Sequence, residues 1–203
     1  MAFLPFSQRA KRWEPMAIAL RRLAGLRDGD VLTPERLADK VGLCLVDARY
    51  ALEGFSESDK RHLLATASGS WSGGVLAHPL PDGKRICIIN PTHPRRRNRI
   101  TLMEEIVHVH RNHVPTGMHE VIPGLRVRTY DADQEAEAYG VGAAALLPWA
   151  SFFHCVNRGV SIEEIADIYD VTTQLAEYRI KITGSTNLYK KRCRVVRTRA
   201  RRR

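Results

Sequence analysis

The segment of residues 75–90 constrains the fold most strongly, because it reads as a β-hairpin. Two strand-like runs, residues 75–80 and 84–90, flank Pro81-Asp82-Gly83, which is typical turn chemistry. Apolar residues then recur at helical spacing from residue 100 to about residue 113. This order of elements predicts an α+β fold, in which a small antiparallel sheet is surrounded by helices.

Local signals predict further elements on both sides of this segment. Expected helices are 34–42 after a Thr33 cap, 56 to about 67, 134–147 ending at Pro148, one starting in the capping box Ser161–Glu164, and a last one capped by Thr172 or Thr173 that ends at Gly184. Expected strands are 43–46 and 125–130. The polar residues 91–99 and the Pro- and Gly-rich residues 115–124 are expected to form loops.

Composition argues against several classes of protein. The chain has 203 residues, of which 44% are hydrophobic, and this suits one globular domain or one domain with a small appendage. No run reaches the roughly eighteen apolar residues of a membrane helix, and the N-terminus lacks the long apolar region of a secretory signal. The four cysteines are widely spaced without a C-x-x-C pair, which argues against a zinc ribbon or a disulfide scaffold. We therefore expect a cytoplasmic protein.

The net charge of +10 is concentrated at the C-terminus. Residues 190–203 hold nine of the 32 Lys and Arg and no acidic residue, so residues 1–189 hold 23 basic against 22 acidic side chains. Such a block is typically disordered and contacts nucleic acid weakly. The expected organisation is therefore a basic N-terminal segment (1–30), one main domain (31–186, with C-terminal helices at 160–184) and a disordered basic tail (187–203).

One helical segment carries residues that suit metal chemistry. On the helix of residues 100–113, Glu104 and His108 are four apart and project from one face, and Glu105 lies at the edge of that face. The geometry is that of H-E-x-x-H metallopeptidases, with Glu in place of the first His. Taken alone the motif is weak, because surface helices often carry an acidic pair and a histidine.

Several motifs in order resemble the ImmA/IrrE family of metallo-endopeptidases. The chain supplies Ile88-Ile89-Asn90, then the run TLMEEIVH at 101–108, then Glu135-x-x-Ala138 followed by Pro148. The run from Gly159 to Thr172 is similar to the family's helical segment after the proline. The resemblance covers roughly residues 30–184 and implies a zincin-like peptidase domain.

The resemblance also implies roles for individual residues. The metal ligands would be Glu104, His108 and Glu135, and the general base would be Glu105. Asp133 competes as third ligand if the register slips by two residues, but its distance to Pro148 fits less well.

Three further histidines lie near the motif. His110 is two residues from His108 and so points to the far side of a helix, and His113 could approach only if the helix ends early. We interpret these two and His119 as ordinary surface or half-buried histidines.

Glutamate at position 104 changes the expected metal chemistry. Zn²⁺ with a His2Glu ligand set keeps one formal positive charge, whereas Glu104, His108 and Glu135 would neutralise the ion. The ion would then be a poorer Lewis acid, and the oxygen ligands would also suit Mn²⁺ or Fe²⁺.

By resemblance, the substrate is expected to be a protein such as a helix-turn-helix repressor, cleaved in stress responses or on mobile elements. Two alternatives remain open. The chain could be a catalytically inactive binding module on a peptidase fold, or a DNA-binding regulator. The second would use the helix-turn-helix-like residues 161–184, with Arg179 and Lys181 on the recognition helix, together with the basic tail.

Overall fold

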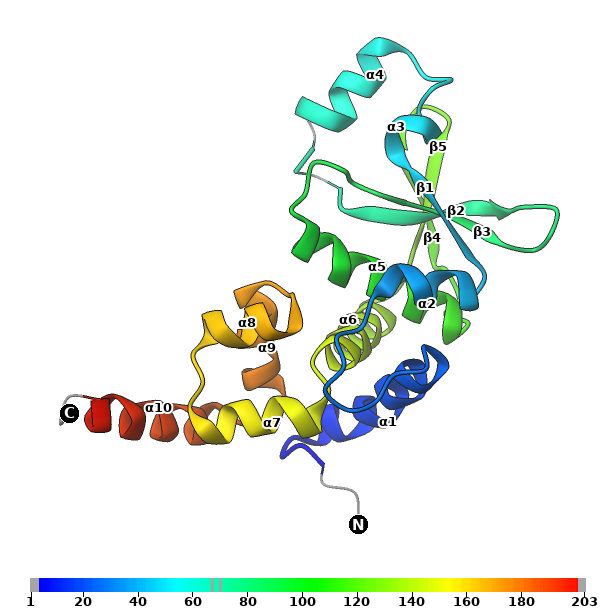
Figure 1. Ribbon diagram of the computed structural model, residues 1–203. Helices are drawn as coiled ribbons and strands as arrows, with labels where there is room; N and C mark the ends of the chain where they lie inside the picture. The colour runs from blue at the N-terminus through cyan, green and yellow to red at the C-terminus, as the bar shows by residue number, and fades with distance from the viewer. Residues whose placement is uncertain (1–3, 67, 70, 201–203) are drawn as a thin grey trace. The chain divides into compact units, whose positions relative to one another are not determined.

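The computed structural model describes residues 4–66, 68, 69 and 71–200 and divides into two compact units (Figure 1). Residues 33–139 form a unit that contains every strand of the described chain, called the sheet unit here. Residues 1–32 and 140–203 belong to the other, called the helical unit. The N-terminal segment, which was expected to stand apart from the domain of residues 31–186, is part of the helical unit.

The sheet unit is built on five strands (Figure 1). They are β1 (Leu43–Asp47), β2 (Gly73–Pro79), β3 (Arg85–Ile89), β4 (Gly117–Ile122) and β5 (Leu125–Thr129), in the order β1-β3-β2-β5-β4. The expected hairpin is confirmed as the antiparallel pair β2 and β3. The α+β class is therefore correct.

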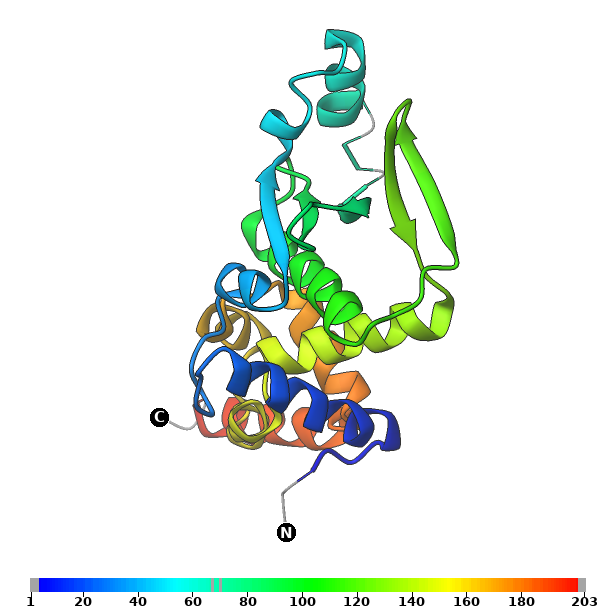
Figure 2. The same cartoon turned by 90° about the vertical axis from the view of Figure 1, so that its right-hand side faces the viewer.

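The expectation of a purely antiparallel sheet is wrong, since β1 pairs with β3 in parallel, with Leu43 opposite Arg85. Strand β3 lies between β1 and β2 in the sheet, parallel to β1 and antiparallel to β2. The strand β4 was also expected to be a loop; its residues are mostly exposed, and antiparallel pairing with β5 forms it (Figure 2).

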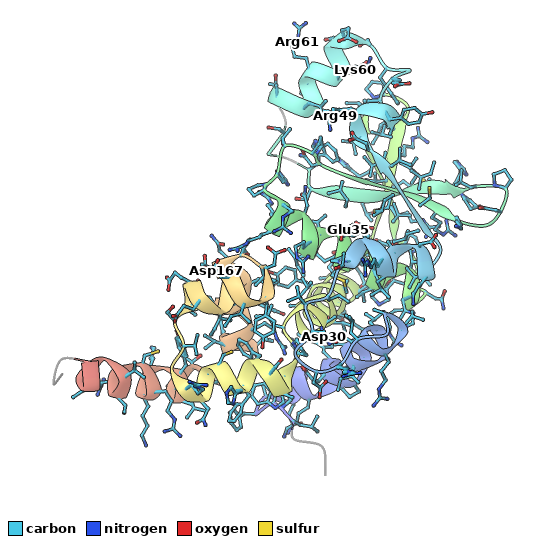
Figure 3. The ribbon with its side chains drawn as sticks, viewed as in Figure 1. Asp30, Glu35, Arg49, Lys60, Arg61 and Asp167 are labelled. Atoms are coloured by element: carbon cyan, nitrogen blue, oxygen red, sulfur yellow. The ribbon has the colours of Figure 1, made fainter. Side chains whose placement is uncertain are left out.

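Among the described residues, five helical segments belong wholly to the sheet unit. They are α2 (Pro34–Lys40), α3 (Ala48–Ala51), α4 (Glu57–Arg61), a π-helix at His62–Thr66 and α5 (Arg95–His110). Thr33 precedes α2 but its side chain makes no cap hydrogen bond, whereas the Ser56 side chain caps α4 as expected. Charged residues of α3 and α4, including Arg49, Lys60 and Arg61, are labelled in Figure 3.

Helix α5 starts at Arg95 after Pro94, more than one turn earlier than expected. The expectation that residues 91–99 form a polar linker is therefore wrong for 95–99, and Arg99 is buried. The helix packs against β2, β3 and α2. Its fully buried side chains are Met103, Ile106 and Val107. Burial of this apolar side fixes the rotation of α5 and hence the direction of its polar residues.

The helical unit contains α1 (Gln8–Leu23), the end of α6 (Ala132–Leu146), α7 (Trp149–Arg158), α8 (Ile162–Tyr169), α9 (Thr173–Ile182) and α10 (Thr186–Ala200). The Ser161 capping box and the Thr172 cap are confirmed. Gly140 allows close approach of α6 to α1, because a Cβ there would lie 2.2 Å from the Trp13 ring. Among the described residues no single helix is long and apolar enough to cross a membrane; α6 and α7, bent by 70°, meet that length and composition only as a pair.

The expectation of a disordered tail is wrong for residues 187–200, which form α10 beside α7 (Figure 1). Gly159 ends α7 with a left-handed φ of 70°, and the backbone of Arg192 lies 3.0 Å from the position of its missing Cβ. The Cys193 thiol donates to the Gly159 carbonyl at 3.9 Å. This packing offsets the repulsion among the cations. Residues 201–203 of the expected tail lie outside the described residues.

A buried ion pair joins α1 to α9 in the helical unit. The Arg179 guanidinium donates to a Glu14 carboxylate oxygen at 3.0 Å, and both side chains are almost inaccessible. Arg179 also donates to the Leu147 carbonyl at 2.9 Å, and the Trp149 amide donates to Glu14. Arg179 therefore cannot contact DNA, and the interpretation of α9 as a recognition helix that uses it is wrong.

Arg179→Met is expected to lower the free energy of unfolding by about 3 kcal/mol, because it leaves the Glu14 carboxylate buried without its cation. Chemical denaturation monitored by circular dichroism would measure the loss. The double variant Glu14→Gln/Arg179→Met removes both charges and should recover part of it. A single-variant loss below about 1 kcal/mol would contradict the importance of this pair.

Candidate metal centre

The candidate site lies in the sheet unit, where the C-terminal half of α5 meets the first turn of α6. Helix α5 carries Glu104, Glu105 and His108, and its buried apolar side holds them in place. Asp131 starts α6 by accepting the backbone amides of residues 133 and 134 at 3.0 and 2.8 Å. This cap places Glu135 in the first turn of α6.

The structure brings two of the expected ligands together. The His108 Nε2 atom lies 3.6 Å from the Glu135 Oε2 atom, although the two residues are on different helices. The His108 side chain is buried, whereas half of the Glu135 side chain is exposed. Asp133, the competing third ligand, is exposed as Glu135 is, and Glu135 is the one that approaches His108.

The other two carboxyl groups, those of Glu104 and Glu105, belong to partly buried residues of α5. Burial, together with the negative charges of Glu105 and Glu135, raises the pKa of Glu104 to about 8. Burial and the Glu135 charge raise the pKa of Glu105 to about 7, while the Arg128 cation and a hydrogen bond from the Val75 amide act against this rise. The site therefore concentrates negative charge in a poorly solvated place.

His113 contacts the second ring nitrogen of His108, the one that does not face Glu135. The two Nδ1 atoms are 2.9 Å apart. The Tyr130 ring stacks on the His108 ring, with centroids 3.7 Å apart. His113 in turn contacts Glu137, with 3.3 Å between Nε2 and Oε1, and Arg111 donates to the same oxygen at 3.0 Å. His113 is half-buried, as one of the sequence interpretations allowed, and it approaches His108 because α5 ends early.

The end of α5 explains why His113 reaches His108. The helix ends at His110, and Asn112 adopts a left-handed conformation with φ of 53°. The His113 amide then donates to the His108 carbonyl at 3.0 Å. This is the hydrogen bond of a Schellman motif that spans the larger number of residues. Asn112 lies inside the helix expected from the sequence, and its left-handed conformation ends α5 about one turn earlier. His110 and His119 are exposed, as interpreted from the sequence.

The donor chemistry of the site fits a divalent cation, because carboxylate oxygens and an imidazole nitrogen converge where a positive charge would relieve repulsion. The ligand geometry is not preformed: among the described residues, no three His, Cys, Asp or Glu side chains are arranged to hold a metal ion. Glu104 and Glu135 are long side chains that could turn towards His108. The residues therefore fit a metal that binds with rearrangement of these carboxylates.

The closeness of the carboxyl groups of Glu104, Glu105 and Glu135 predicts how the stability of the metal-free protein depends on pH. Glu104 has a pKa of 4.5 as a model group and about 8 in the folded chain, so the folded state binds this proton more tightly. The free energy of unfolding should therefore fall as pH rises from about 5 to about 8, by on the order of 3 kcal/mol. Glu104→Gln should reduce this slope, and Glu105, whose pKa is also raised, should retain part of it. Urea denaturation of chelator-treated protein would measure it, and equal slopes for wild type and variant would contradict the expectation.

The family model described as the IrrE N-terminal-like domain, a peptidase family, matches residues 60–181, which is more than half of the chain. A search of curated proteins finds none that matches. The matched region contains Glu104, Glu105, His108 and Glu135.

Proposed function

The chain belongs to the family of IrrE N-terminal-like domains, and from this premise we propose that it is a metal-dependent endopeptidase acting on a protein substrate. The family is metallopeptidase-like. We assign the metal ligands to Glu104, His108 and Glu135, and the general base to Glu105. The observation that carries this proposal is the approach of His108 Nε2 to Glu135 Oε2, at 3.6 Å, beside two partly buried carboxyl groups with raised pKa values.

Zn²⁺ is the proposed ion, with Mn²⁺ or Fe²⁺ as alternatives because two of the three ligands are carboxylates. When bound, the ion would supply Lewis-acid polarisation of the scissile carbonyl. Glu104 in place of histidine makes the ligand set more negative and so offsets more of the ion's charge. This favours a slower peptidase than one with two histidines, since the carbonyl would be less polarised.

Glu105 has the properties that a general base needs. Its pKa of about 7 allows it to take a proton from the attacking water near neutral pH and to return it to the leaving amine. The hydrogen bond from the Val75 amide orients its carboxylate, and the Arg128 cation stabilises the ionised form. Tyr130, stacked on His108, limits the movement of that ligand.

The proposed substrate class, a helix-turn-helix repressor, rests on the resemblance to the ImmA/IrrE family. Purified protein incubated with Zn²⁺ or Mn²⁺ and a repressor encoded beside it is expected to yield discrete fragments on a denaturing gel. A chelator should suppress the cleavage, and a later excess of metal should restore it. Cleavage at the same rate with and without the chelator would contradict a metal-dependent peptidase. Metal binding without cleavage of any repressor would favour an inactive binding module.

A further inference from the structure

A chain of three side chains leads from α6 to the buried face of His108. Glu137 contacts His113 Nε2 at 3.3 Å, and His113 Nδ1 contacts His108 Nδ1 at 2.9 Å. Only 9% of the His113 side chain and 16% of the Glu137 side chain are exposed. Glu137 does not belong to the proposed ligand set, and His113 was not expected to take part in the site.

One assignment of the protons satisfies all of these contacts together. Glu137 also accepts from Arg111 at 3.0 Å, which favours a carboxylate that can only accept hydrogen bonds. His113 must then donate through Nε2. A neutral imidazole has one donor, so His113 Nδ1 is an acceptor, and the proton between the two rings belongs to His108 Nδ1. His108 Nε2 therefore keeps its lone pair, on the side that faces Glu135.

We propose that His113 is a positioning residue: together with Glu137 it fixes His108 in the Nδ1–H tautomer and presents an unprotonated Nε2 towards Glu135. The value of this arrangement for metal binding rests on the proposed function, because a histidine ligand must offer an unprotonated nitrogen. The partner on the other ring nitrogen sets the tautomer and the ring orientation.

The tautomer can be measured without any metal, which separates this proposal from the proposed function. Imidazole ¹⁵N NMR of the chelator-treated protein, at a pH where the rings are neutral, should show His108 protonated on Nδ1 in the wild type. His113→Leu should give a mixture of tautomers. His113→Gln should restore the wild-type signature, because its amide can both accept from His108 and donate to Glu137. A wild-type His108 protonated on Nε2 would overturn the proposal.

Metal affinity provides the functional readout. In Zn²⁺ titrations, His113→Leu should weaken binding by about 10- to 100-fold, and His113→Gln should stay within a few-fold of wild type. His110→Leu is the matched control on an exposed histidine of α5 and should bind as wild type does. Equal affinity of wild type and His113→Leu would overturn the positioning role. If the wild type binds no metal, the proposed function is refuted. The NMR measurement of the His108 tautomer would still test the positioning role of His113.

A second inference comes independently from the distribution of charge between the units. In the sequence of the sheet unit, 14 Lys and Arg balance 14 Asp and Glu. The helical unit has 18 basic against 8 acidic residues and so carries the whole net charge of +10. Its helix α10 contains no acidic residue. The exposed cations described on α10 are Lys190, Lys191, Arg192 and Arg194.

We infer that α10 is a nucleic-acid contact, which binds backbone phosphates without reading sequence. Four exposed cations within little more than one helical turn complement the high charge density of a duplex. A membrane fits less well, since the large apolar side chains exposed on the described part of α10 are Val195 and Val196, whereas membrane-surface helices present Trp, Phe or Leu. The Arg179 side chain of α9 is buried and so takes no direct part in this contact with nucleic acid.

The test measures binding of the full chain to a duplex DNA of arbitrary sequence across a series of salt concentrations. Changing Lys190, Lys191, Arg192 and Arg194 together to Gln should reduce the slope of log K against log salt by about 3 to 4. The matched control changes the exposed Arg36, Arg49, Arg61 and Arg126 of the sheet unit to Gln, and its slope should stay near wild type. Equal losses in both variants would overturn the assignment to α10. The nucleic-acid inference would be overturned if the wild type showed no salt-dependent binding to DNA, or if it bound anionic vesicles more tightly than DNA.

Discussion

Glu105→Gln is expected to abolish cleavage of the protein substrate while metal affinity stays nearly unchanged. Glutamine keeps the size of the side chain and can still accept the hydrogen bond from the Val75 amide, but it cannot take a proton from the attacking water. Loss of a general base typically costs about 10²- to 10⁴-fold in rate. The measurement is the initial rate of fragment formation with saturating Zn²⁺ or Mn²⁺.

A matched control for this variant is Glu120→Gln, which removes the charge of an exposed carboxylate on β4 and should leave the rate unchanged. Equal rates for wild type and Glu105→Gln would show that Glu105 is not the base. If neither protein cleaves although both bind metal, the chain is a binding module on a peptidase fold. Glu105→Gln should also stabilise the metal-free protein, because it removes one of the crowded carboxylates.

Glu135→Ala is expected to weaken metal binding by more than about 100-fold, the largest loss for a single change in α6. The reason is that Glu135 approaches His108 Nε2 from a second helix. Without it, α6 would supply none of the three proposed ligands. Asp133→Ala is the matched control, since Asp133 is an exposed carboxylate two residues away. Competition with a metal-sensitive dye would measure both affinities. A greater loss in Asp133→Ala would mean that the third ligand is Asp133.

The parts of the fold that local chemistry determines could be predicted from the sequence. Turn residues identified the β2–β3 hairpin, and caps identified the starts of α4, α8 and α9. Pairing across the chain could not be read in this way. The parallel pairing of β1 with β3 joins segments that are distant in the sequence, and the exposed β4 is specified by its partner β5 rather than by its own pattern.

Helix α10 shows the same limit in terms of charge. The density of cations in residues 190–203 favours disorder when the segment is considered alone, but α10 packs beside α7, where Gly159 leaves room for its backbone. Which segment would cover that part of α7 depends on tertiary structure. A count of charges does not contain this information.

The candidate site also has a part that could be predicted from local sequence and a part that could not. The spacing of Glu104 and His108 places them on one face of α5 from sequence alone, whereas Glu135 required the resemblance to a family, because it lies on another helix. His113 was missed because its approach to His108 depends on the left-handed Asn112. The buried environment that raises the pKa values of Glu104 and Glu105 likewise arises only from packing of α5 against the sheet.

The central claim is that Glu104, His108 and Glu135 together bind a divalent metal ion. The most direct measurement is the metal content of protein dialysed against limiting Zn²⁺, compared with the triple variant Glu104→Ala/His108→Ala/Glu135→Ala. We predict about one Zn²⁺ per wild-type chain and almost none in the folded triple variant. Equal metal content in the two proteins would contradict the claim.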